Sequence, residues 1–141
     1  MGMPLEGSTP HRPPALLIDS VEEYSPSGAL ATARLRESTP YACDDGTLEP
    51  IAYVEMMAQC FAACAGLAAR RAGLPVSSWG YLAALKRVII HAPSRVGDTL
   101  HIRAGIGASL GEITVVRAEV RNRNALVAEG EFKIFVPKEE S

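Results

Sequence analysis

The sequence has few of the features that mark specialised protein classes. It contains only three cysteines, Cys43, Cys60 and Cys64, and an odd number in a chain of 141 residues argues against a disulfide scaffold. Cys60 and Cys64 can share one helix face, but no nearby histidine or further cysteine completes a set of metal ligands. We therefore expect small buried thiols in a helix and no metal site.

Long runs of one charge or of apolar residues are also missing. Fourteen Lys and Arg residues against sixteen Asp and Glu residues give a net charge of -2. No basic block predicts nucleic-acid binding, and no acidic tail is present. Arg70 and Arg71 interrupt the longest apolar segment, so no membrane span is expected. Residues 1–10 lack the basic start and apolar run of a signal peptide, and the expected location is the cytoplasm.

The sequence does contain enough apolar residues for one compact core. Hydrophobic residues make up 48% of the chain, and the length suits one domain. We predict a single domain over residues 11–137, with short tails at 1–10 and 138–141.

The strongest helical segment covers about residues 48–72. Pro50 suits the first turn, no proline follows within the segment, and Gly73 ends it. Many of its residues are alanine, and apolar residues lie on almost every side between Val54 and Leu67. A helix that is apolar all round is typical of a buried helix.

The remaining segments predict strands. An apolar run at 15–18 indicates a buried strand or turn, and residues 19–24 and 29–37 predict a hairpin. After the helix, strand patterns cover 81–90, 99–109, 113–121 and 125–136, and short turns join the last three into an antiparallel meander. We predict an α+β fold in which about six strands wrap around one long helix. The open edge of such a sheet predicts a homodimer.

Glu55 is an unexpected carboxylate within the apolar helix. A buried carboxylate needs hydrogen bonds or has a raised pKa, and a raised pKa suits a general acid or base. Alternatively, Glu55 faces water near the positive end of the helix dipole. The residue pattern alone leaves both interpretations open.

Four segments, taken in order, resemble motifs of one enzyme family. Residues 11–19 match His-Arg-x-Pro-x-Leu-Leu-x-Asp, residues 54–59 match Val-Glu-x-Met-Ala-Gln, residues 80–86 resemble a central-strand segment, and residues 96–100 resemble Pro-Gly-Asp-x-Leu. These are motifs of the 3-hydroxyacyl-acyl-carrier-protein dehydratases, and the resemblance covers about residues 11–136.

The resemblance implies a hot-dog fold, a dimer with an acyl-pantetheine tunnel at its interface, and Glu55 as the catalytic carboxylate. The implied reaction converts a 3-hydroxyacyl thioester on an acyl carrier protein, or on coenzyme A, to the trans-2-enoyl thioester. It needs no metal or dissociable cofactor. The residues expected to contact the substrate are Tyr41, Ile51, Gln59, Tyr81 and Leu82.

The sequence departs from the family at two catalytic positions. The family's histidine before the helix falls on Tyr41, and the glycine whose N–H polarises the thioester falls on Pro50, which has no N–H. The N–H of Ile51 is a possible substitute. This pattern resembles the divergent branch found with aryl-polyene pathways, in which an Asp- and Gly-rich loop replaces the histidine motif.

His11 is the candidate base that replaces the missing histidine, since it lies in a matched motif and neutral imidazole accepts protons. Alternatively, His11 only holds the N-terminal segment in place. Tyr41 is expected to line the tunnel rather than to donate a proton, and Asp44 and Asp45 are expected to be turn residues. Lys86, Arg87 and Arg95 are candidates for contacting an acidic carrier protein.

Two further functions use the same fold. A thioesterase would use Glu55 or a loop aspartate to activate water. A non-catalytic acyl-binding protein, or the inactive subunit of a heterodimer, would explain the missing histidine and Pro50.

Overall fold

The computed structural model describes residues 16–25, 27–71 and 81–135, with residues 64–71, 81–85 and 134–135 described by their backbone alone. His11 and both predicted tails lie outside the described residues. None of the described helices is long and apolar enough to cross a membrane.

One helix and six strands make up the described chain. In order they are β1 (Ser20–Ser25), β2 (Gly28–Arg34), α1 (Pro50–Arg71), β3 (Tyr81–Ile90), β4 (Thr99–Leu110), β5 (Ile113–Asn122) and β6 (Ala125–Phe135). The predicted helix and six strands are confirmed. Residues 16–18 belong to no strand, although Leu17 and Ile18 are buried.

The strands form a single antiparallel sheet in the order β1-β2-β4-β5-β6-β3. The N-terminal hairpin and the β4-β5-β6 meander follow the prediction, because short turns join neighbouring strands. Two pairings join strands that are distant in sequence, β2 with β4 and β3 with β6. The sheet therefore has β1 at one edge and β3 at the other.

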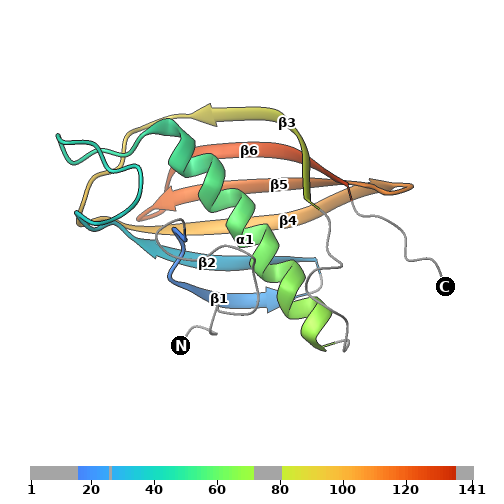
Figure 1. Cartoon of the computed structure of the whole chain (residues 1–141). Coiled ribbons are helices and arrows are strands. Elements are labelled where there is room, and N and C mark those ends of the chain that lie inside the picture. Colours follow the sequence, from blue (N-terminus) through green and yellow to red (C-terminus); the bar gives the residue numbers. More distant parts are fainter. Residues whose placement is uncertain (1–15, 26, 72–80, 136–141) are drawn as a thin grey trace.

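The helix α1 lies across one face of the curved sheet (Figure 1). Strand β2 alternates buried and partly exposed residues, and its buried members are the small Ala29, Ala31 and Ala33. The helix buries Met56, Met57 and other residues on the side that faces the sheet. Small side chains on the sheet let the helix approach closely, and they produce one continuous core.

Candidate active site

Glu55 lies on the side of α1 that the sheet leaves partly uncovered. Glu55 itself is partly buried, and so are Ala58 and Ala62 beyond it. Ile51, one turn earlier, exposes 45% of its surface. Residues four apart share a helix face, so these residues form one stripe along α1. The helix is thus not buried all round within one chain, contrary to the prediction.

The start of α1 presents a backbone donor near Glu55. Pro50 is the first helical residue, as predicted. The first N–H groups of a helix have no partner within the helix. Among the described residues, none accepts a hydrogen bond from the N–H of Ile51. This N–H is one turn before Glu55.

Tyr41 is positioned beside the helix start by its backbone. Its carbonyl accepts a hydrogen bond from the N–H of Glu49 at 2.9 Å, and Ala42 forms a bridge with Leu48. Tyr41 has φ 68°, in the left-handed region that disfavours a bulky side chain. Such backbone strain persists where neighbouring contacts impose it, and it is common at functional sites. Tyr41 is 39% exposed.

The turn at 44–47 is held from two sides. Within the turn, the Asp45 carboxylate accepts hydrogen bonds from the Thr47 hydroxyl at 2.6 Å and the Thr47 N–H at 2.9 Å. The hydroxyl bond, followed by the backbone bond, lowers the pKa of Asp45 below its ordinary value. From outside, the Arg95 guanidinium donates to the Asp45 carbonyl at 3.5 Å. Asp45 is therefore a turn residue, and Arg95 supports the turn.

Gln59 follows Glu55 by one turn and is fully buried. Its Oε1 accepts a hydrogen bond from the N–H of Leu17 at 2.7 Å. The bond joins two of the motifs that carry the family resemblance. Sequence reasoning missed this contact because nothing in either motif shows its partner. The predicted contact of Gln59 with substrate stays a prediction.

Tyr81 and Leu82 begin β3, where they pair with the end of β6. This end of β3 lies away from the start of α1 (Figure 1). One chain therefore brings Tyr41, Ile51 and Glu55 to the same end of the helix, but it does not bring the start of β3 there. The side chains of Tyr81 and Leu82 are not among those described.

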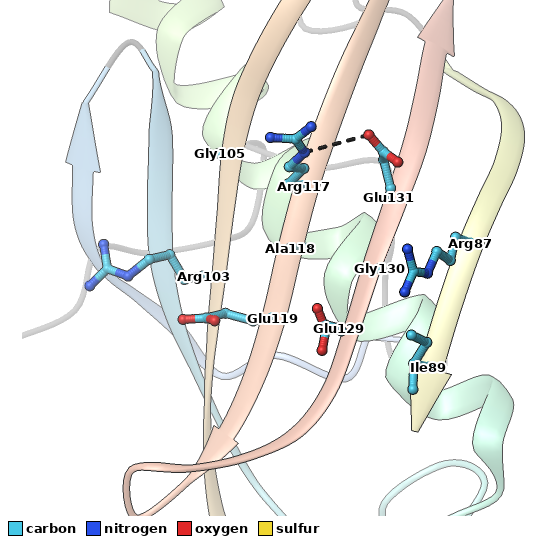
Figure 2. Close-up of a pocket in the computed structure, with 10 residues that line it drawn as sticks. All are labelled: Arg87, Ile89, Arg103, Gly105, Arg117, Ala118, Glu119, Glu129, Gly130 and Glu131. Carbon is cyan, nitrogen blue, oxygen red and sulfur yellow. Dashed lines mark hydrogen bonds and ion pairs between the residues drawn. The ribbon is translucent and has the colours of Figure 1, made fainter. Parts of the chain in front are cut away.

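A pocket of about 550 Å³ lies over the outer face of the sheet, on the side away from α1 (Figure 2). Charged side chains from β3 to β6 line it, among them Arg87, Arg117 and Glu131. Glu131 accepts from Arg117 at 3.4 Å and pairs with Lys86 at 3.5 Å. The pocket contains none of the candidate catalytic residues, so it is separate from the Glu55 site.

The thiols behave as the sequence predicted where they are described. The buried Cys60 thiol lies within hydrogen-bonding distance of the carbonyls of Ala29 at 3.6 Å and Ile102 at 3.5 Å, and neither Cys43 nor Cys60 forms a disulfide. The side chain of Cys64 lies outside the described residues. Among the described residues, no group of three His, Cys, Asp or Glu side chains is arranged to hold a metal ion.

A six-stranded antiparallel sheet that wraps one long helix in this order is the hot-dog fold. The ApeP dehydratase family model matches residues 3–141, and the chain belongs to this ApeP-like family. It is a dehydratase, a hydro-lyase, and the predicted dehydration of a 3-hydroxyacyl thioester is confirmed at the level of the family. No curated protein matches the chain in sequence.

Solved structures share the fold at low sequence identity. The dehydratase heterocomplex ApeI:P from Xenorhabdus doucetiae matches with a TM-score of 0.86 and 19% identity, over 97% of this chain and 93% of that chain. A hypothetical thioesterase with coenzyme A from Streptococcus pneumoniae matches at 0.69 and 13%, over 86% and 88%. The phenylacetic acid degradation protein PaaI from Thermus thermophilus matches at 0.69 and 18%, over 87% and 96%.

Proposed function

We propose that the chain dehydrates 3-hydroxyacyl groups on an acyl carrier protein, with Glu55 as the acid that protonates the departing hydroxyl. The observation that carries this proposal is the position of Glu55 on the partly uncovered stripe of α1, one turn after the exposed residue Ile51. Tyr41 and Ile51 line the acyl group's entry, and the cytoplasm is the proposed location.

In the proposed reaction, different groups of the protein act on C2, on the C3 hydroxyl and on the thioester oxygen of the substrate. A base, His11 in the first instance, removes the C2 proton, and the electron pair forms the C2–C3 double bond. The C3 hydroxyl takes the proton of Glu55 and leaves as water. The Ile51 N–H donates to the thioester oxygen, whose negative charge increases as the C2 proton leaves. The base then gives up the C2 proton and Glu55 regains one, both by exchange with water, and the trans-2-enoyl thioester departs.

We further propose that β3 pairs edge to edge with a second hot-dog subunit. Strand β3 is ten residues long, and its outer edge is unpaired in the single described chain. Antiparallel pairing of two β3 strands about a twofold axis places the start of one beside the end of the other. The partner subunit's Tyr81 and Leu82 would then approach the end of this chain's β3. In this arrangement, the partner subunit supplies to the Glu55 site the start of β3, which lies away from Glu55 within one chain.

The second subunit is an identical copy in the homodimer predicted from the sequence. The matching ApeI:P complex contains two different chains by its description, and this supports a test with a different hot-dog subunit as well. Light scattering of the purified chain distinguishes the two cases. Twice the chain mass together with enoyl formation supports the homodimer, whereas activity only after a second kind of subunit is added supports a heterocomplex.

The catalytic role of Glu55 is tested by Glu55→Gln, which keeps the side-chain shape and removes the acid. We expect turnover of a 3-hydroxyacyl carrier-protein substrate to fall by about a hundredfold or more, since general acid catalysis contributes on this scale. Ultraviolet absorption of the enoyl product measures the rate. Glu49→Gln, which removes an exposed carboxylate just before the helix, is the control and should retain activity.

Two outcomes would contradict the proposal. Unchanged turnover in a folded Glu55→Gln variant removes Glu55 from the mechanism. Release of free thiol from an acyl thioester without enoyl product identifies a thioesterase instead.

A further inference from the structure

The turn at 95–98 is a type II β-turn that has valine at a position favouring proline. The N–H of Asp98 donates to the carbonyl of Arg95 at 2.9 Å, and the third residue, Gly97, has φ 102°. Type II turns favour proline at the second position and glycine at the third. The second residue is Val96, where the related motif Pro-Gly-Asp-x-Leu has proline. Val96 therefore occupies a position that suits proline, but unlike proline it has a backbone N–H.

This additional N–H holds the loop that precedes α1. It donates to the carbonyl of Gly46 at 2.8 Å, and the neighbouring Arg95 and Thr47 form a β-bridge. Gly46 belongs to the loop at 41–49, which stands in place of the wider family's histidine motif. The sequence thus departs from the family at Val96 and in this loop, and one hydrogen bond joins the two departures.

The turn is also fixed to parts of the molecule other than this loop. The N–H of Gly97 donates to the carbonyl of Leu35 at 2.8 Å, and the N–H of Leu35 donates to the carbonyl of Asp98 at 2.9 Å. The N–H of Ser94, just before the turn, donates to the buried hydroxyl of Tyr53 in α1 at 2.9 Å. The turn is therefore a fixed support on which the loop can rest.

The loop at 41–49 connects this support to the start of the helix. The N–H of Cys43 donates to the carbonyl of Thr47 at 2.7 Å, and the N–H of Glu49 donates to the carbonyl of Tyr41 at 2.9 Å. The two sides of the loop are thus bonded to each other, so a displacement at residue 46 also displaces Tyr41. The left-handed backbone of Tyr41, at φ 68°, persists only where such contacts impose it.

From these contacts we propose that Val96 is a positioning residue: its N–H holds the loop at 41–49 so that Tyr41 keeps its place beside Ile51 and Glu55. Val96 acts through the loop and not on the substrate. The proposal rests on the proposed function in one respect, because it requires Tyr41 to line the entry of the acyl group.

Val96→Pro tests the proposal, because it removes the N–H from a turn that accommodates proline. Proline also restricts the unfolded chain, which offsets the lost hydrogen bond. We expect the denaturant midpoint to stay close to that of the wild type. We expect kcat/KM for a 3-hydroxyacyl pantetheine thioester to fall by about tenfold, within the range of a small misplacement. Val96→Ala keeps the N–H and is the matched control, with kcat/KM at the wild-type value.

A double-mutant cycle with Tyr41→Ala determines whether Val96 acts through the loop. If the N–H serves to place the Tyr41 ring, Val96→Pro causes no further loss of kcat/KM once the ring is absent. Losses that multiply in the double variant would overturn the proposal, as would wild-type kcat/KM in a folded Val96→Pro or in Tyr41→Ala. An equal loss in Val96→Ala would overturn it too. The proposed role of Glu55 is decided separately by Glu55→Gln.

The hydrogen bond can be measured in the wild-type protein whether or not Val96→Pro folds. NMR detects a scalar coupling across such a bond, here from the Val96 amide nitrogen to the Gly46 carbonyl carbon. We expect this coupling together with slow exchange of the Val96 amide hydrogen. Rapid exchange without the coupling would overturn the proposal. In folded Val96→Pro the amide resonance of Tyr41 should shift, and a Tyr41 resonance at its wild-type position would contradict transmission through the loop.

Discussion

The carboxylate of Asp45 orders the turn that leads toward the helix start. It accepts from both the hydroxyl and the N–H of Thr47, and the hydroxyl is the main reason that its pKa is lowered. Arg95 and Val96 then hold the outer side of the same turn. The turn is therefore a defined structure beside Tyr41, in the place where the wider family has its histidine motif.

The Thr47 hydroxyl can be removed to test this arrangement. In Thr47→Val the pKa of Asp45 should rise toward its ordinary value, near 3.9. Because the folded-state pKa is the lowered one, the stabilisation is complete above the unfolded-state pKa and disappears as the pH falls through the folded-state pKa. Wild type and variant should therefore differ in thermal stability near neutral pH and converge in acid.

Carbon-13 NMR titration of Asp45 measures the pKa directly. Thr47→Ser keeps the hydroxyl and should restore the lowered value. An unchanged pKa in Thr47→Val would assign the shift to the backbone N–H rather than to the hydroxyl.

Single residues also mark the limit of sequence reasoning at the site. Glu55 was found from its motif and from its charge in an apolar helix, and both signals are local. The attachment of Gln59 to Leu17 joins residues 42 positions apart, so no local pattern could predict it. The left-handed backbone of Tyr41 follows from how the loop closes on Glu49, which depends on the folded loop and not on the residue type.

At the scale of elements, the pairing of β2 with β4 depends on close backbone approach. Gly28 and Gly105 lie opposite each other in the register. A Cβ on Gly28 would lie 2.5 Å from the Ala104 carbonyl oxygen, whereas a Cβ on Gly105 would meet only the Ser27 carbonyl oxygen at 3.9 Å. Of these two facing glycines, only Gly28 is at a position where a side chain would collide with the neighbouring strand.

Alanine substitutions should separate the two positions. Gly28→Ala forces the backbone apart and should lower the free energy of unfolding by about 1–3 kcal/mol, the usual cost of overpacking. Gly105→Ala should be neutral or stabilising by about 0.5–1 kcal/mol, because alanine restricts the unfolded chain. Denaturant unfolding at one fixed protein concentration measures both. An equal decrease in the free energy of unfolding in both variants would show that the steric difference between the two positions does not determine stability.

The elements themselves were largely predictable from the sequence. Pro50 fixes the first helical residue, alternation defines β2, and the meander follows from short turns. The strand order was not predictable in the same way. The pairings of β2 with β4 and of β3 with β6 depend on how the helix carries the chain across the sheet, and periodicity holds no information on this.

At the scale of the whole molecule, the unpaired edge of β3 is the proposed place of association. Ile90, at the end of β3, is 38% exposed. A charge on an edge strand opposes edge-to-edge pairing. Ile90→Glu should therefore shift the protein toward the single-chain mass in light scattering on dilution, while its circular dichroism stays that of the folded chain.

Leu110→Glu is the matched control for this prediction. Leu110 is 86% exposed at the tip of the β4–β5 hairpin, at the other end of the sheet from Ile90 (Figure 1). This variant should keep the wild-type mass. If both variants dissociate, or neither does, the edge of β3 is not the place of association.

The strand order has a consequence for synthesis on the ribosome, where the chain emerges from its N-terminus. The second edge of β2 pairs with β4, so Gly28 cannot form its pairing until Gly105 has left the ribosome. During that interval the β1–β2 hairpin exposes an edge that the finished sheet covers, and α1 has no complete sheet to pack against. The N-terminal part of the nascent chain is therefore the part that needs protection from premature pairing.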